Sequence, residues 1–198
     1  MQTRRLGRTD LAIGPLVLGG NVFGWTADKK TSFDVLDRFV AAGLNAIDTA
    51  DVYSAWAPSN SGGESETIIG EWMKARGNRE RVIVVTKVGS PMGKGKEGLK
   101  ARYIAEAAEA SLKRLQVDAI DLYLSHWPDI AAPLEETLGA YERLIKEGKI
   151  RWCGASNLSP KLLEAALAVS RTKGLPRYEV LQPEYNLADR HEFESGLA

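Results

Sequence analysis

The sequence predicts an α/β fold in which a parallel sheet is covered by helices, and two observations indicate this class. Apolar strand-like runs alternate with segments of helical period, and each run begins roughly 30 or more residues after the last, the size of one strand–helix–strand unit. The strand-like runs are apolar on both faces, which is typical of parallel strands buried on both sides.

A short N-terminal β-hairpin, TRRLG turning into LAIGPL, is expected first. Six strands are predicted after it: LVLGG from Leu16, NAIDTA from Asn45, VIVVTKV from Val82, IDLYLSHW from Ile120, IRWCGAS from Ile150 and EVLQPEY from Glu179. The helices between them are expected to begin near Thr31, Glu64, Lys100, Leu134 and Pro160. Start signals include Ser32 ahead of an apolar stripe, Ser159 followed by a first-turn proline, and Pro133. Gly148 is expected to close the fourth helix.

Two architectures fit this order: a doubly wound open sheet and a (β/α)8 barrel. The segment LGGNVFG after the first strand lacks the G-x-G-x-x-G of dinucleotide-binding open sheets. Polar residues also end different strands, which in a barrel share one rim where active sites are built. These are Asp48, Lys87, His126, Ser156 and Asn157. We therefore predict a TIM barrel forming one domain over residues 1–198.

Composition excludes several classes of partner. Lys plus Arg equals Asp plus Glu at 26 each, with no long charged block, so neither nucleic acid nor a membrane surface is expected as a partner. No run approaches the roughly 20 apolar residues of a membrane span. The one cysteine, Cys153, forms no internal disulfide and is expected inside the barrel. A cytoplasmic protein with a small-molecule substrate and no metal is predicted.

Lys87 lies in an apolar strand, where an unpaired charge is costly, so a carboxylate partner is expected. Asp48, one strand away, is the candidate. A tyrosine beside that ammonium, Tyr53, would have its pKa lowered by about 1 to 3 units and could act as a proton donor. His126 would orient a carbonyl oxygen across the rim. This set suits carbonyl reduction.

No side chain delivers hydride, so a nicotinamide cofactor is implied. Ser156, Asn157 and Gln182 are the polar types suited to binding its carboxamide. A different interpretation uses Lys87 as the nucleophile of a Schiff-base aldolase. The neighbouring Asp48 argues against it.

The segments that carry these residues resemble those of aldo-keto reductases, in the same order. They are LVLGGNVFGW, GLNAIDTADVYS, GGESETIIGEWMK, VVTKVG, LKRLQVDAIDLYLSHWPD, GKIRWCGASNLS and LQPEYNLADR. The resemblance implies a catalytic tetrad of Asp48, Tyr53, Lys87 and His126. It also implies NADPH-dependent reduction of aldehydes or ketones.

The resemblance further implies roles in binding. NADP(H) would contact Asp48, Ser156, Asn157 and Gln182, and the substrate pocket would include Val22, Phe23, Trp25 and Trp127. The QPEYNLADR segment resembles the long-chain branch that includes potassium-channel β subunits. A catalytically silent fragment or binding subunit is therefore the alternative function.

The family barrel has eight strands, whereas six are predicted here. The expected fold is thus a barrel lacking its last two β/α units. Its two sheet edges, along LVLGGN and VLQPEYN, would be open, and self-association through them is expected.

Overall fold

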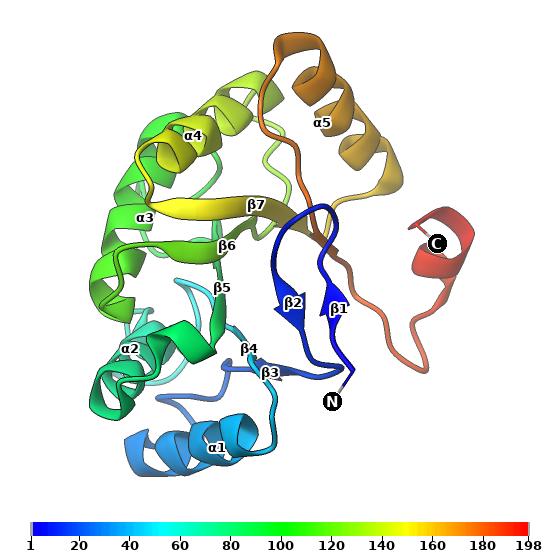
Figure 1. Ribbon diagram of the computed structural model, residues 1–198. Coiled ribbons are helices and arrows are strands. Elements are labelled where there is room, and N and C mark those ends of the chain that lie inside the picture. The colour runs from blue at the N-terminus through cyan, green and yellow to red at the C-terminus, as the bar shows by residue number, and fades with distance from the viewer. Residues whose placement is uncertain (1, 198) are drawn as a thin grey trace.

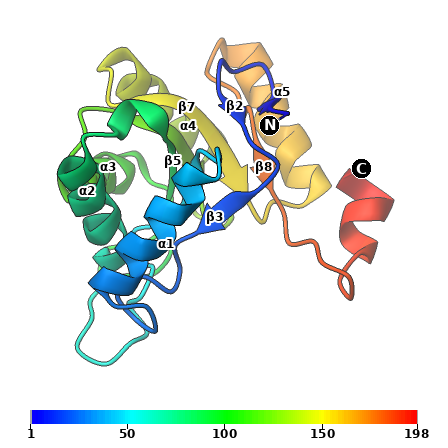
Figure 2. The ribbon, with the colours of Figure 1, turned by 60° about the horizontal axis from the view of Figure 1, so that its bottom comes forward.

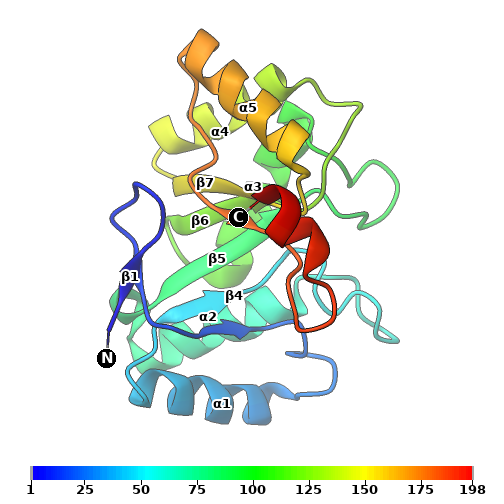
Figure 3. The same cartoon turned by 90° about the vertical axis from the view of Figure 1, so that its right-hand side faces the viewer.

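The computed structural model describes residues 2–197 and contains a curled parallel sheet of six strands (Figure 1, Figure 3). The strands are β3 (Val17–Gly19), β4 (Ala46–Asp48), β5 (Ile83–Val88), β6 (Ile120–Ser125), β7 (Ile150–Ser156) and β8 (Leu181–Gln182). Each strand pairs in parallel with the next one along the chain. The sheet therefore curls into a half-barrel, which confirms the predicted barrel class with six strands present.

The five α-helices of the described chain lie on the outer face of this sheet (Figure 2). They are α1 (Lys29–Ala41), α2 (Glu64–Arg76), α3 (Ala101–Leu115), α4 (Leu134–Lys146) and α5 (Pro160–Lys173). A 3-10 turn, η1 (Arg79–Arg81), precedes β5, and a π-helical turn, η2 (Phe193–Leu197), ends the described chain. None of the helices within residues 2–197 has the length and apolar character needed to cross a membrane.

Most helix starts follow the predicted signals. Ser159 caps α5 by accepting a hydrogen bond from the Leu162 backbone N–H, with Pro160 in the first turn. The predicted start signal of α1 was wrong, because Asp28 and not Ser32 caps the helix, accepting a hydrogen bond from the Thr31 N–H. Ser32 lies inside the helix instead, and its hydroxyl donates to the Asp28 carbonyl at 2.7 Å. At the far end of α4, Gly148 follows the helix with φ 71°, as a C-terminal glycine does.

Two apolar clusters hold the half-barrel together. The larger lies between the sheet and the helices, with Trp72, Tyr123 and Tyr141 among its fully buried side chains. The smaller fills the concave side of the sheet with Leu11, Val85, Leu122 and Leu124.

The N-terminal hairpin, β1 (Arg4–Arg5) and β2 (Ala12–Ile13), closes this concave side and confirms the predicted hairpin. Leu11, just before its second strand, is 2% exposed, and burying a leucine contributes roughly 2 kcal/mol. Cys153 was predicted inside the barrel, but its side chain belongs to the outer, helix-facing cluster. Alternation along β7 places its neighbour Trp152 against the inner cluster instead.

Candidate active site

The C-terminal ends of β4, β5 and β6 bring three of the predicted catalytic residues to one rim. Asp48 is the last residue of β4, Lys87 lies one residue before the end of β5, and His126 directly follows β6. The loop after β4 returns Tyr53 to the same place. The half-barrel thus assembles all four residues of the predicted tetrad.

Lys87 is the centre of this group and is 1% exposed. Its ammonium donates to Asp48 Oδ2 at 2.7 Å, to the Thr49 carbonyl at 2.8 Å and to the Tyr53 hydroxyl at 2.9 Å. Burial lowers the pKa of Lys87, and the Asp48 carboxylate opposes that shift. Three acceptors around Nζ suit an ammonium that is held in place, which confirms the predicted Lys87–Asp48 pair.

Tyr53 has a raised pKa, so the predicted lowering by Lys87 was wrong. Burial is the main cause, and the Asp48 carboxylate adds to it by disfavouring a second negative charge. The phenol is therefore protonated at neutral pH. Its hydroxyl also lies 3.4 Å from Asp48 Oδ2.

His126 faces Tyr53 across the rim, with 6.0 Å between ring centroids. Burial, followed by the positive charge of Lys87, lowers the pKa of His126 to about 4. The imidazole is therefore neutral near pH 7. Its Nδ1 lies 3.0 Å from the hydroxyl of Ser90, a residue that sequence reasoning missed.

Exposed aromatic side chains surround Tyr53 and His126. Trp25 and Trp127, both predicted pocket residues, are 50% and 53% exposed. Trp127 stacks on His126 at 6.1 Å. Trp56, which was not predicted, contacts Tyr53 edge-on at 6.1 Å and Trp25 at 5.8 Å. The tryptophan in YSAWAP, three residues after Tyr53, is the signal that sequence reasoning overlooked.

The other two predicted pocket residues lie deeper. Phe23 is 1% exposed and belongs to the outer hydrophobic cluster, a position that does not favour contact with a substrate. Val22 is half-buried and packs against the same cluster.

The predicted carboxamide-binding residues lie beside the tetrad. Gln182 Nε2 donates to Asp48 Oδ1 at 3.1 Å, and Asn157 Nδ2 donates to the His126 carbonyl at 3.0 Å. Ser156 donates to the Gln182 carbonyl at 2.9 Å. Within residues 2–197 the side-chain oxygens of Asn157 and Gln182 accept no hydrogen bond. These two acceptors could receive a carboxamide N–H, so the residues present fit a nicotinamide.

A second buried charge cluster lies behind Lys87 and was not predicted. Glu66 is 0% exposed, accepting from Thr86 at 2.6 Å and from Arg114 at 2.6 Å. Asp51 is also buried, and neither of its carboxylate oxygens has a hydrogen-bond partner in the described chain. Burial, then the Glu66 charge, raises the pKa of Asp51 to about 7. This rim therefore contains charge that the fold leaves incompletely satisfied.

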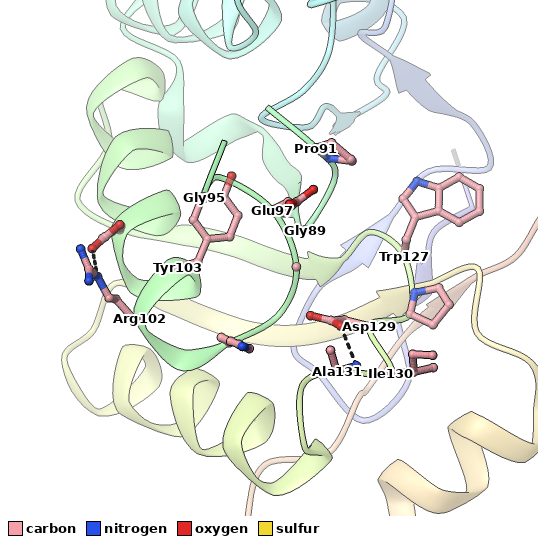
Figure 4. A pocket seen from close by; sticks show the side chains of 14 residues that line it. Gly89, Pro91, Gly95, Glu97, Arg102, Tyr103, Trp127, Asp129, Ile130 and Ala131 are labelled. Carbon is pink, nitrogen blue, oxygen red and sulfur yellow. Dashed lines mark hydrogen bonds and ion pairs between the residues drawn. The ribbon is translucent and has the colours of Figure 1, made fainter. Parts of the chain in front are cut away.

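A cavity of about 830 Å³ opens beside the tetrad, between the loops after β5 and β6 (Figure 4). Trp127 borders it, whereas none of the four tetrad residues does. Asp129 joins the two loops by accepting from the Leu99 N–H at 2.8 Å, and it also accepts from the Ala131 N–H of its own loop at 2.9 Å. The cavity therefore adjoins the predicted reaction centre without containing it.

Comparison with known proteins decides the family. A model of the aldo/keto reductase family matches residues 15–198. The chain belongs to the aldo/keto reductase family. This confirms the resemblance seen in the sequence.

Three relatives illustrate the match. The protein Tas of Escherichia coli is 33% identical over 221 residues, covering 100% of this chain and 64% of Tas. Aldo-keto reductase YhdN of Bacillus subtilis is 37% identical over 190 residues, which cover 94% of this chain and 53% of YhdN. A probable voltage-gated potassium channel subunit beta of Oryza sativa is 36% identical over 198 residues, which cover 98% of this chain and 58% of that subunit. The chain thus spans between half and two thirds of the length of these relatives, and the β-subunit match confirms the expected branch.

Proposed function

We propose that this chain carries the catalytic residues of an oxidoreductase that reduces aldehydes or ketones with NADPH. The observation that carries the proposal is the position of Lys87, whose ammonium contacts both the Asp48 carboxylate and the Tyr53 hydroxyl. Family membership supports a nicotinamide cofactor. The phosphorylated form and the carbonyl substrate follow from the resemblance.

Each side chain has one task in this proposal. A reduced nicotinamide supplies the hydride when it is bound. Tyr53 gives its phenolic proton to the carbonyl oxygen as negative charge develops there, and Lys87 stabilises the phenolate that remains. Asp48 holds the ammonium in place. His126 orients the carbonyl oxygen through a ring N–H.

The aromatic side chains above Tyr53 favour one kind of substrate. Trp25, Trp56 and Trp127 are half-exposed around the proton donor. Flat apolar groups pack well against such rings, and an aromatic pair contributes about 0.5–1.5 kcal/mol beyond area burial. A small aromatic aldehyde is therefore the preferred substrate class.

The test follows NADPH absorbance when the purified chain meets an aromatic aldehyde. We expect Tyr53→Phe to reduce turnover by about 10²–10⁴-fold, the usual contribution of a general acid. Tyr185→Phe removes the same hydroxyl from an exposed tyrosine that donates to Glu194 and makes no hydrogen bond to the tetrad, so it serves as the matched control. Turnover that is equal in wild type and Tyr53→Phe would overturn the proposed role.

The alternative is an aldo-keto-reductase-like subunit that binds without catalysis, and the similarity to a potassium channel subunit beta supports it. NADPH binding with no turnover of reactive aldehydes would favour this function. The aldolase hypothesis predicts that borohydride traps a substrate on Lys87. The three acceptors that enclose Nζ oppose it.

A further inference from the structure

Ser90 contacts the imidazole of His126 from the loop after β5. It follows β5 by two residues, and Gly89 with φ 115° makes the turn that brings it there. Its hydroxyl lies 3.0 Å from His126 Nδ1, and the two residues are 4% and 9% exposed. The contact is therefore a buried hydrogen bond between this loop and the residue that follows β6.

The rest of His126 is held by several neighbours. Its backbone N–H donates to the Val88 carbonyl at 2.8 Å, and its carbonyl accepts from Asn157 at 3.0 Å. Trp127 stacks on the ring with 17° between planes, and Tyr53 packs edge-on at 6.0 Å. The ring plane is thus fixed, and what is left to define is which nitrogen carries the proton.

A neutral imidazole has one donor nitrogen and one acceptor nitrogen, so two hydrogen-bond directions are open. If Nδ1 donated to Ser90, the serine proton would need an acceptor, and the described chain offers no second partner for that hydroxyl. If Ser90 donates, its proton is satisfied and Nδ1 is the acceptor. Buried polar groups are rarely left without partners, so the second direction is favoured.

The direction of this bond sets what His126 presents to the rim. When Nδ1 accepts, the proton lies on Nε2. Nε2 has no hydrogen-bond partner among the described residues, and it is not fully buried. Nε2–H is then the donor available to a carbonyl oxygen.

We propose that Ser90 is a positioning residue that holds His126 in the tautomer with its proton on Nε2, by donating its hydroxyl proton to Nδ1. This inference rests on the proposed function only where it gives the tautomer a role in binding the substrate carbonyl. A carbonyl oxygen needs a hydrogen-bond donor, and the other tautomer would present the lone pair of Nε2 instead. The tautomer itself exists without substrate or cofactor. It can therefore be measured independently of turnover.

The experiment uses nitrogen-15 NMR of the full chain at neutral pH, where protonated and unprotonated ring nitrogens resonate far apart. The chain has two histidines, and His191→Gln removes the exposed one, leaving only the His126 signals. We expect a protonated Nε2 and an unprotonated, hydrogen-bonded Nδ1. A protonated Nδ1 in the wild-type ring would overturn the proposal without touching the Tyr53 result.

Two variants test the role of the hydroxyl. In Ser90→Ala the Nδ1 resonance should move away from its hydrogen-bonded position and a population with protonated Nδ1 should appear. Ser90→Thr keeps the hydroxyl and should restore the wild-type spectrum. An alanine spectrum identical to wild type would also overturn the proposal, and the wild-type and threonine spectra decide the question if the alanine variant does not fold.

Kinetics supply the second readout. With NADPH and an aromatic aldehyde we expect Ser90→Ala to lower kcat about ten-fold, as expected for one net hydrogen bond, and Ser90→Thr to restore it. A loss of kcat with an unchanged tautomer would assign Ser90 a packing role instead. If wild type shows the Nε2–H tautomer without any turnover, this inference stands and the proposed reductase activity fails.

Discussion

The two ends of the sheet both carry buried carboxylates, but they satisfy them differently. At the N-terminal end, Asp121 accepts hydrogen bonds from Arg151 at 2.8 Å and from the Val84 N–H at 2.8 Å, and it forms an ion pair with Arg79 at 2.9 Å. At the C-terminal rim, both oxygens of Asp51 lack a partner in the described chain.

This difference indicates what each end is for. A carboxylate that is fully paired contributes to stability, whereas one that is buried without partners costs stability. Barrels of this class build their active sites at the C-terminal ends of the strands. The unpaired carboxylate of Asp51 at that rim therefore lowers stability, and variants at the two ends should separate the two roles.

The largest expected effect is on the free energy of unfolding in Asp51→Asn. The pKa of Asp51 is about 7 in the folded protein against 3.8 for an ordinary aspartate, so between these two pH values the folded state binds a proton that the unfolded state has lost. Stability therefore falls as pH rises through this window, and a shift of roughly three units corresponds to about 4 kcal/mol at the upper end. Asparagine should remove that loss, so the variant gains on wild type by up to about 4 kcal/mol above pH 7.

Urea unfolding from pH 4 to 8 checks this. Asp118→Asn, which makes the same change at an exposed site, is the matched control. A difference in unfolding free energy between Asp51→Asn and wild type that stays constant across this pH range would contradict the burial of an unpaired carboxylate at Asp51.

His126 should make the free energy of unfolding depend on pH in the opposite direction. Its pKa of about 4 lies below the ordinary 6.5, so the unfolded chain binds more protons between these values. Stability then rises with pH across that window, by about 3 kcal/mol for a shift of roughly 2.5 units. In His126→Gln this dependence should disappear, making the variant relatively more stable at pH 4 than at pH 7.

The same urea series measures it, with His191→Gln at an exposed site as control. Because Asp51 and His126 act in opposite directions between pH 4 and 6.5, their effects partly cancel in wild type. The single variants should therefore show a stronger dependence of unfolding free energy on pH than wild type does. Equal slopes of unfolding free energy against pH in wild type and His126→Gln would show that the imidazole is not desolvated.

The opposite end of the sheet is tested by Asp121→Ala. Arg151 and the Val84 N–H lose a charged hydrogen-bond acceptor, and Arg79 loses its ion-pair partner. Hydrogen bonds to charged groups contribute about 1.5–3 kcal/mol, so we expect a loss of about 2 kcal/mol. Both arginines keep some contact with water, which limits the loss. The catalytic rate per folded molecule should not change, because the proposed active site lies at the other end of the strands.

Unfolding and kinetics of Asp121→Ala are compared with those of Asp34→Ala, which removes an exposed partner of Lys30 and should have no measurable effect on either. A fall in kcat without a fall in stability would break the assignment of the N-terminal end to structure.

The sequence was sufficient for the architecture because parallel strands buried on both faces leave long apolar runs. The runs from Val82 and Ile120 became β5 and β6, and polar residues at their ends met at one rim as predicted. The partner of Lys87 was predictable for a related reason, since a charge in an apolar strand requires one. The extent of β8 was less predictable, because the strand spans only Leu181–Gln182 of the predicted EVLQPEY run. The preceding Glu179 and Val180 each add one backbone hydrogen bond to β7.

What the sequence did not reveal depends on loop conformation and on burial. Ser90 reaches His126 only because Gly89 turns the chain, and Trp56 reaches Tyr53 through a loop that includes Ser54 at φ 72°. Neither backbone angle follows from periodicity. The pKa of Tyr53 was predicted in the wrong direction because the sequence identified its charged neighbour but not how deeply the phenol is buried.

The smallest expected effect concerns Trp56, which is exposed at the C-terminal rim. Its ring contacts Tyr53 and Trp25 edge-on, so truncation should remove one aromatic wall without changing Tyr53, the proposed proton donor. Because one aromatic pair contributes about 1 kcal/mol, Trp56→Ala should raise KM for an aromatic aldehyde several-fold and leave kcat nearly unchanged. A straight-chain aldehyde, which gains less from the ring, serves as the comparison substrate. An equal rise in KM for both aldehydes would mean that Trp56 shapes the loop after β4 rather than contacting the substrate, and a fall in kcat would place its influence on Tyr53.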